Sequence, residues 1–177
     1  MVKTVAPSGP GSFNVVEVGN EYQATKIATV FRCVEILSAG VAGLPFRKKR
    51  LNRAEGYFLD VDGTTDRTNY LIGVRPNSHS TGYELIKNAV AQMHLQGNAY
   101  IVPRYDLTGK LSELILCSPR TVSHDPVTDV YTVNDLYNGI FGETFLPNEI
   151  IHLRNMSLDG GRTGISTIQY AAAALGI

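Results

Sequence analysis

A glycine-rich stretch toward the carboxyl end has the residue types that come closest to a ligand site. Gly160, Gly161 and Gly164 stand directly before a segment with helical character, and backbone N–H groups at the start of a helix can cradle an anion. A nucleotide-binding loop also needs a Lys followed by Ser or Thr, but Ile165-Ser166 occupies that place. The pattern therefore favours a chain reversal before the helix. The alternative function is a small phosphate- or nucleotide-binding enzyme domain that uses residues 160–164.

A run of four cations, Arg47, Lys48, Lys49 and Arg50, offers a second kind of chemistry. Clustered cations bind phosphates and release counterions from DNA. No aromatic residue is interleaved among them to stack on bases, and a charge run is also typical of a solvated loop. Nucleic-acid binding by these four residues is therefore a hypothesis that stands beside a purely solvated loop.

Residue types suited to metal binding or catalysis are scattered along the chain. No two of the four histidines have ligand spacing, and the acidic residues at positions 60, 62 and 66 lack the terminal Glu of a calcium loop. No Gly-x-Ser-x-Gly elbow is present, and no Ser or Cys stands near a plausible base. The sequence thus predicts no catalytic residue, no metal ligand and no cofactor. The histidines are His79, His94, His124 and His152.

The two cysteines, Cys33 and Cys117, are far apart in the sequence and have no Cys or His neighbour at ligand spacing. This spacing argues against a disulfide framework and against a zinc site. We expect two buried thiols in a reducing cytosol.

Length and charge fit one domain without a global attraction for polyanions. The chain has 177 residues, enough for one core. Sixteen Lys and Arg residues balance sixteen Asp and Glu residues, so no overall field draws nucleic acid or an anionic membrane. Residues 1–20 lack the apolar stretch of a signal peptide or a spanning helix. We expect synthesis in the cytoplasm and no membrane partner.

The first third of the chain predicts an arm followed by a helix. Four Pro and Gly residues between positions 7 and 11 predict a flexible arm over residues 1–23 that orders on contact with a neighbour. From Thr25, apolar residues recur every three or four positions, which predicts a helix that ends before Pro45. We expect its stripe to pack in the core or between subunits. The stripe consists of Ile27, Phe31, Val34 and Leu37.

A second helix has clear boundary signals. Thr81 and Glu84 form a capping box at its start, and Gly97 stands where a left-handed cap is needed. We expect its apolar residues Leu85, Val90 and Met93 in the core. Between the two helices the sequence predicts a strand that begins at residue 44, a short strand over 57–61 and one helical turn over 70–74.

The remainder predicts mainly antiparallel strands. Residues 99–105 and 111–117 are apolar runs joined by a loop containing Gly109, which indicates a hairpin. Shorter strands are predicted at 121–124 and 130–133, with a further hairpin around 137–139 and a closing strand at 150–153. A last helix begins at Ile165. The predicted class is α+β, with antiparallel β-hairpins packed with two or three helices.

Six motifs in consistent order over residues 24–177 resemble the portal proteins of the type named after phage HK97. Gly97-Asn98-Ala99-Tyr100 is similar to the "G-N-A-Y" signature of that family. Residues 146–154 resemble its "L-x-x-x-E-V-I-H-I-R" passage, and 157–168 resemble "S-x-D-G-x-x-G-x-S-P-I". The other three lie at residues 29–46, at 75–85, where Arg75-Pro76-Asn77 precedes the capping box, and at 118–122.

The resemblance implies a portal wing-like α+β domain over residues 24–177. It implies a structural subunit of a ring, usually a dodecamer, that forms the DNA translocation channel and the head–tail connector at one capsid vertex. The implied partners are copies of the chain, the terminase large subunit, the capsid protein, a head-completion adaptor and double-stranded DNA passing through the channel. The implied location is the virion, assembled in the cytoplasm of the bacterial host.

The sequence departs from the family pattern in three places. Residues 50–70 carry little of the usual motif, and Thr167 stands where the family commonly has proline. The sequence also stops at Ile177 inside an apolar helical pattern. We therefore expect an N-terminal portion that is incomplete at its C-terminal end, before the stem and clip, so channel-lining residues cannot be transferred to it.

Overall fold

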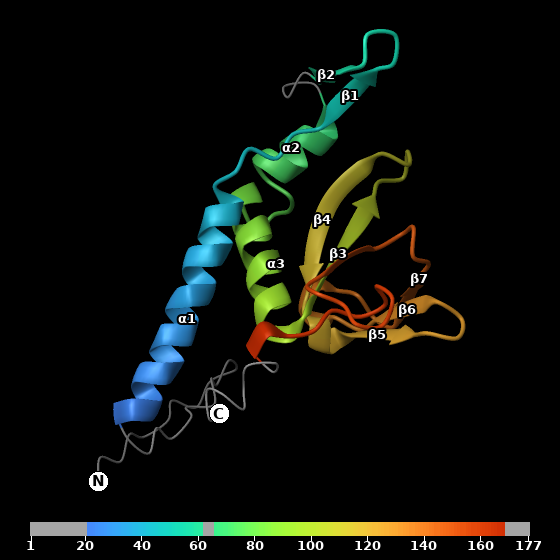
Figure 1. The fold of residues 1–177 in the computed structure, drawn as a ribbon. Coiled ribbons are helices and arrows are strands. Elements are labelled where there is room, and N and C mark those ends of the chain that lie inside the picture. Colours follow the sequence, from blue (N-terminus) through green and yellow to red (C-terminus); the bar gives the residue numbers. More distant parts are fainter. Residues whose placement is uncertain (1–20, 62–65, 169–177) are drawn as a thin grey trace.

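The computed structural model describes residues 21–61 and 66–168, with side chains from residue 28 onward. Its helices are α1 (Glu21–Ala42), α2 (Arg67–Gly73) and α3 (Gly82–Gln96), and its first two strands are β1 (Lys49–Asn52) and β2 (Tyr57–Asp60). The strands β3 (Asn98–Tyr105), β4 (Leu111–Cys117), β5 (Val122–Asp125), β6 (Val130–Val133), β7 (Glu143–Phe145) and β8 (Ile151–Arg154) follow. The predicted α+β class is confirmed (Figure 1).

The strands form three separate antiparallel sheets: the two-stranded β1-β2 hairpin, the middle sheet β4-β3-β8 and the last sheet β5-β6-β7. The predicted β3–β4 hairpin is confirmed, and its register pairs Val102 with Ile115. The closing strand β8 does not continue the second hairpin series. It returns to pair with β3, Tyr100 opposite His152, and so completes the middle sheet.

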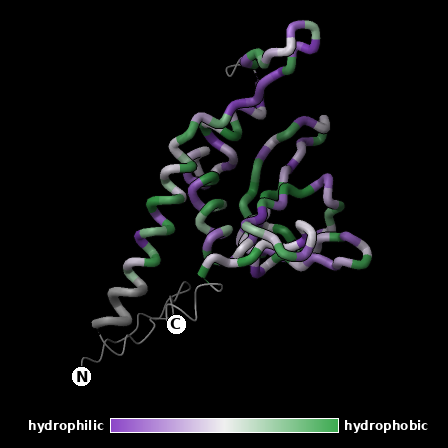
Figure 2. The backbone as a smooth tube through the Cα atoms, viewed as in Figure 1, coloured by the Kyte–Doolittle hydropathy of each residue, from purple (hydrophilic) through white to green (hydrophobic). Residues whose placement is uncertain are grey.

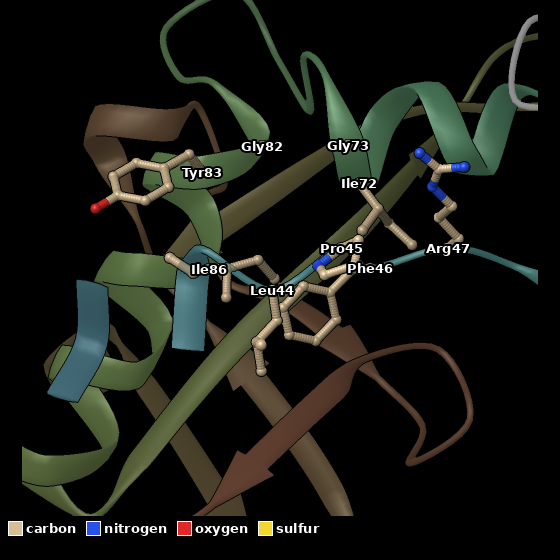
Figure 3. A pocket seen from close by; sticks show the side chains of 10 residues that line it. Leu44, Pro45, Phe46, Arg47, Ile72, Gly73, Gly82, Tyr83 and Ile86 are labelled. Atoms are coloured by element: carbon tan, nitrogen blue, oxygen red, sulfur yellow. The ribbon is translucent and has the colours of Figure 1, made fainter. Parts of the chain in front are cut away.

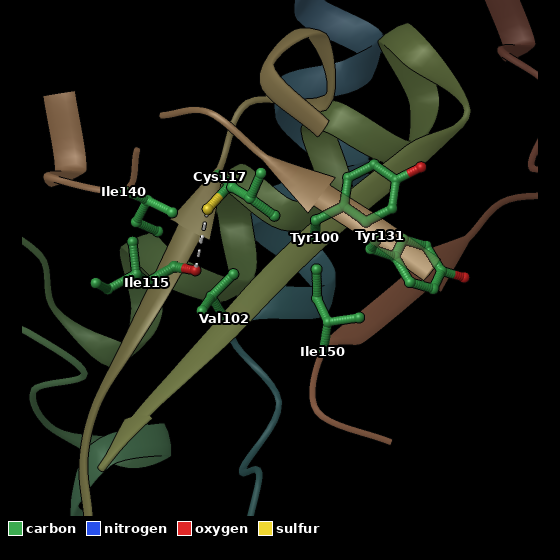
Figure 4. Close-up of a cluster of buried hydrophobic side chains, with 8 residues drawn as sticks. Tyr100, Val102, Ile115, Cys117, Tyr131, Ile140 and Ile150 are labelled. Carbon is green, nitrogen blue, oxygen red and sulfur yellow. Dashed lines mark hydrogen bonds between the residues drawn. The ribbon is translucent and has the colours of Figure 1, made fainter. Parts of the chain in front are cut away.

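The middle sheet buries both of its faces. Side chains alternate along a strand, so Tyr100 and Val102 point toward the β5-β6-β7 sheet while Ile101 points toward the helices. Two clusters of buried side chains result. On the face toward the last sheet, Tyr100 and Val102 pack with Cys117, Tyr131 and Val133 (Figure 4). On the other face, Ile101 and Leu114 pack with Leu71 of α2 and Leu85 of α3. The layers therefore run from α1 through α3 and the middle sheet to the last sheet.

Helix α3 begins and ends as the sequence predicts. The Thr81 hydroxyl accepts from the Glu84 N–H (3.2 Å), and the Glu84 carboxylate accepts from the Thr81 N–H (2.8 Å). Gly97 closes the helix with φ 85°. Of the expected core residues, Leu85 is buried, while Val90 and Met93 are half-buried.

Helix α1 differs from the expectation in its start and in its buried face. It begins at Glu21, four residues before Thr25. Among its described side chains, those of Ser38 and Ala42, both small, are buried, and α1 packs along α3. Phe31 and Leu37 are 69% and 52% exposed. The expectation that these two residues lie in the core is wrong for this chain alone, since small residues provide the close approach. Val34 is half-buried, and the Ile27 side chain lies outside the described residues.

Residues 44–48 form no strand, contrary to the expectation, and β1 begins only at Lys49. The N–H of Lys48 instead donates to the Asn69 side chain (2.6 Å). The helical turn predicted over 70–74 is real but begins at Arg67, because the Asp66 side chain accepts from the Asn69 N–H (3.0 Å) and caps the helix.

Two backbone segments cross closely where α3 ends, one at Gly97 and the other at Gly164. A Cβ on Gly97 would collide with the Gly164 carbonyl oxygen, and a Cβ on Gly164 would collide with the Gly97 carbonyl oxygen. The Asn98 carboxamide holds the crossing, because its Oδ1 accepts from the Gly164 N–H (2.8 Å) and its Nδ2 donates to the Gly164 carbonyl (3.2 Å). The crossing joins the start of β3 to the segment that leads into the helix beginning at Thr167.

His152 links this crossing to the last sheet. Its Nε2–H donates to Asn98 Oδ1 (2.9 Å), and its Nδ1 accepts from Arg154 Nε and lies 3.1 Å from the Tyr131 hydroxyl. Burial, assisted by the nearby Arg154 and His124, lowers the pKa of His152 from 6.5 to about 4. The imidazole is therefore neutral at pH 7.

We predict that Gly97→Ala is much more destabilising than Gly109→Ala. Both glycines have positive φ, 85° and 77°, but a Cβ on Gly109 meets no atom within 4 Å. Gly109→Ala should lower the free energy of unfolding by about 1 kcal/mol, and Gly97→Ala by about 2–4 kcal/mol because the collision adds to the backbone strain. Chemical denaturation measures both, and equal losses would contradict the steric role of the crossing.

Acidification should destabilise the protein through His152. Its folded-state pKa of about 4 lies below the ordinary 6.5, so the unfolded chain takes up the proton first. The contribution is complete above pH 6.5 and is lost as the pH falls toward 4. It should amount to about 1–2 kcal/mol, since the site is only half-buried. The unfolding free energy of His152→Gln should depend less on pH in this window, with His79→Gln at an exposed site as the control. Parallel curves for the wild type and His152→Gln would refute this role.

Candidate functional surfaces

The predicted cationic run lies at the base and along the first strand of the β1-β2 hairpin, which projects from the body beyond α2 (Figure 1). Two of its members are paired with carboxylates. Lys48 Nζ lies 2.8 Å from Asp66, and Lys49 Nζ lies 3.3 Å from Asp60. The hydrogen bond from Lys48 lowers the pKa of Asp66. Much of the charge of the two lysines is therefore balanced locally.

We call residues 47–60 the basic ribbon. Within the described ranges, Arg47, Arg50 and the turn residue Arg53 form no ion pair. Strand pairing also brings two aromatic residues of β2 onto the same hairpin as these cations, with Tyr57 opposite Asn52 and Phe58 opposite Leu51. The sequence hypothesis for nucleic-acid binding did not include Arg53, Tyr57 or Phe58. A prediction that residues 49–52 pair with 57–60 would have placed these residues on the same hairpin as the cations.

The glycine loop is occupied by a carboxylate of its own chain. The Asp159 side chain accepts from the backbone N–H groups of Arg162 (2.9 Å) and Thr163 (3.0 Å), and from the hydroxyls of Ser157 and Thr163. These hydrogen bonds, led by those from the Ser157 and Thr163 hydroxyls, hold the pKa of Asp159 far below its usual value. The donors that a phosphate would need are thus already bound to an anion. Nothing in this geometry favours the nucleotide-binding alternative.

An exposed apolar surface follows α1 and the residues after it. We call it the apolar flank, and its members extend from the helix to a hollow of about 220 Å³ between α1, α2 and α3 (Figure 3). Leu44 and Phe46 line the hollow together with Ile72, Tyr83 and Ile86. Figure 2 shows hydrophobic positions recurring along α1. The flank consists of Phe31, Leu37, Val41, Leu44 and Phe46.

The remaining chemical candidates have local roles or none. Cys33 is exposed on α1, so the expectation that it is buried is wrong, because only a narrow face of that helix meets α3. Cys117 is buried as expected, and burial raises its pKa to about 12. His124 bonds to Asp129 (2.8 Å) and His94 to Thr167 (3.3 Å), and His79 is exposed. Among the described residues no group of three His, Cys, Asp or Glu side chains is arranged to hold a metal ion.

None of the described helices combines the length and the apolar character that crossing a membrane requires. Several charged side chains at the surface form local ion pairs. Arg104 makes a two-pronged contact with Glu143 (2.7 and 2.8 Å) that ties β3 to β7. This contact lowers the pKa of Glu143 and raises that of Arg104.

Comparison with known proteins gives one consistent family. The family model for phage portal proteins matches residues 28–177. The chain is 24% identical over 191 residues to a probable portal protein of Streptomyces phage phiC31, an alignment that covers 97% of this chain and 39% of the relative. This chain thus spans well under half of that relative's length.

Solved structures share the fold at low sequence identity. The neck of an empty gene transfer agent particle, computed with C6 symmetry, matches with a TM-score of 0.61 at 21% identity and covers 89% of this chain and 43% of the other. The native neck, computed with C12 symmetry, gives 0.58 at 20% and covers 89% and 42%. An HK97 family phage portal protein from Corynebacterium diphtheriae gives 0.53 at 18% and covers 90% and 50%.

Three features that carry the fold, the Gly97–Gly164 crossing, the Asn98–His152 link and the capped helix α3, lie within the residues that the family model matches. The sequence motifs, the family model and the fold therefore agree. This chain belongs to the phage portal protein family.

Proposed function

We propose that the protein is a structural subunit of a portal ring, a head–tail connector at the capsid vertex through which double-stranded DNA is moved, and that it has no enzymatic activity. Family membership supports this proposal, as does the fold shared with neck structures computed with cyclic symmetry. The terminase large subunit, capsid protein and head-completion adaptor are partners that the family resemblance suggests. The site of action would be the virion, after assembly in the bacterial cytoplasm.

The observation that carries the proposal is the apolar flank. A cyclic ring is held by a heterologous contact, in which one face of a subunit meets a different face of the next. Such a contact needs apolar area that the isolated subunit leaves exposed. The flank supplies it along a helix whose buried residues, among the described side chains, are the small Ser38 and Ala42. Phe31 and Leu37 therefore serve the intersubunit role that the sequence left open for them.

Substitution in the flank should prevent ring formation without unfolding the subunit. Phe31→Ser/Leu37→Ser should weaken association at least about 100-fold, because burying each large apolar side chain contributes roughly 1.5–3 kcal/mol per interface. Thermal stability of the monomer should hardly change, since both side chains are already exposed. Native mass spectrometry of the longest expressible form measures ring assembly.

The matched control is Leu107→Ser/Val127→Ser, which removes two fully exposed apolar side chains from loops of the sheets. Rings should persist in this control. Rings of undiminished stability in Phe31→Ser/Leu37→Ser would remove the flank from the interface.

We also propose that the basic ribbon contacts double-stranded DNA. A two-stranded ribbon fits the major groove, and Arg forms two-pronged bonds with phosphate. Both Arg50 and Arg53 are exposed, and Tyr57, which is 47% exposed, lies on the same face of the hairpin as Arg50. The ribbon therefore combines cations and aromatics, which the sequence run from Arg47 to Arg50 lacked.

Binding to a fluorescein-labelled 24-base-pair duplex, followed by anisotropy, tests the ribbon in the full chain. Each phosphate contact contributes about −0.9 to the slope of log K against log salt. Arg50→Ser/Arg53→Ser should therefore make this slope about 2 less negative. Lys110→Ser/Arg120→Ser removes the same charge from exposed sites elsewhere and should have little effect. An equal effect of both pairs would reduce the ribbon to a general charge contribution.

A further inference from the structure

A second hollow, of about 410 Å³, lies on the side of α3 away from α1. Leu85 and Leu95 of α3 and Leu116 of β4 give it apolar walls, and Asn88, Gln92 and Asn138 add carboxamides. It does not overlap the apolar flank or the basic ribbon. Its position beside the end of β4 relates it to the free edge of the middle sheet.

That edge is protected along most of β4. Pro103 has no N–H and lies opposite Leu114, so this is a pair without mutual hydrogen bonds and the Leu114 backbone points away from β3. Leu114 bonds outward, its N–H to the Pro76 carbonyl and its carbonyl to the Asn77 side chain, each at 2.9 Å. Arg67 covers the carbonyls of residues 111 and 112. Natural sheets commonly block their edges in this way.

The protection stops at Leu116. Two residues beyond Leu114, its N–H and carbonyl also point outward, and neither has a hydrogen-bond partner within residues 21–61 and 66–168. Leu116 is the residue of β4 that lines the hollow. The unprotected part of the edge and the hollow therefore coincide.

A side chain in the same hollow also lacks a donor. Oε1 of Gln92 is buried and is the one such side-chain atom without a hydrogen-bond partner in the described part of the chain. Buried carbonyl oxygens normally accept a hydrogen bond. Because protein atoms already cover this oxygen, a ligand with an N–H group and apolar side chains would instead pair with Leu116 and cover the leucines.

We propose that the hollow receives an extended peptide segment, residues 13–18 of a neighbouring copy of this chain. The sequence Phe-Asn-Val-Val-Glu-Val at these positions is rich in the residues that favour strands. Adding a strand to an open sheet edge is a common mode of peptide recognition. The inference rests on the proposed ring, because it needs a second copy at the surface.

Geometry favours a neighbouring copy over the same chain. At 100° per residue, Leu85, Asn88 and Gln92 share one side of α3, and they line this hollow. Tyr83 and Ile86 line the hollow at the end of α1, and Lys87 Nζ lies 3.9 Å from Glu35 of α1. The side of α3 that meets α1 is therefore opposite to this hollow, which favours a segment from a neighbouring copy.

Isotope-coded photo-crosslinking of the full chain tests this. Leu95, 45% exposed in the hollow, is replaced by photoreactive p-benzoylphenylalanine, and this protein is mixed with a ¹⁵N-labelled copy that keeps Leu95. Mass spectrometry should find crosslinks from the unlabelled hollow to labelled residues 13–18. Val16→Asp/Val18→Asp in the labelled copy should lower the yield at least about ten-fold, because an unpaired carboxylate is costly to bury. Val2→Asp/Val5→Asp is the matched control and should leave the yield unchanged.

A photoreactive residue at Tyr83, on the opposite side of α3, should not capture the segment. Crosslinks within one copy, or a yield that ignores Val16 and Val18, would overturn the inference. A labelled synthetic peptide of residues 11–20, added to dilute protein, separates this inference from the ring proposal. If monomers that never form rings capture the peptide, the peptide site in the hollow is supported and the ring proposal is contradicted. If rings form without any crosslink to residues 13–18, the ring proposal is supported and the peptide site is contradicted.

Discussion

The close crossing of two backbone segments at Gly97 and Gly164 is the constraint on which the rest of the structure depends. No side chain fits there, so the end of α3 and the start of β3 can lie directly against the segment that leads into the next helix. Asn98 and His152 hold the crossing with hydrogen bonds from neighbouring strands of the middle sheet. Tyr131 connects it to the last sheet. One local contact thus fixes the relative positions of helix, sheet and the chain that follows.

Because the middle sheet buries both faces, the apolar residues of the body are largely used in its two clusters. Helix α1 lies outside these layers and meets α3 through Ser38 and Ala42. Its larger apolar residues remain available for another molecule. Charged groups of the body are likewise bound within the chain. The Asp159 carboxylate accepts hydrogen bonds from the backbone of the glycine loop, and Glu143 pairs with Arg104. These groups stabilise the scaffold, while the arginines of the projecting ribbon remain for contact with a partner.

Hydrogen bonds connect several of the residues that carry the family resemblance. The Gly-Asn pair at 97 and 98, the His at 152 and the Gly at 164 are far apart in the sequence but form one network. A change at one position leaves partly buried polar groups of the others without partners, which is costly. The motifs are therefore structural, and the likeness of this chain to longer portal proteins follows from a shared body.

The sequence by itself determined the features that depend on neighbouring residues. The capping box at Thr81 and Glu84, the left-handed cap at Gly97 and the β3–β4 hairpin follow from local hydrogen bonding and turn geometry. The tertiary structure alone decided which apolar faces are covered. Phe31 belongs to a helical stripe that fits a core, and Cys33 is expected to be buried, yet both side chains are exposed. It also decided the pairing of β8 with β3, the hydrogen bonding of the glycine loop to Asp159 and the pairing of the basic strand β1 with the aromatic strand β2. Each of these features depends on contacts between residues that are distant in the sequence. The periodicity and spacing of residues do not specify which distant residues come into contact.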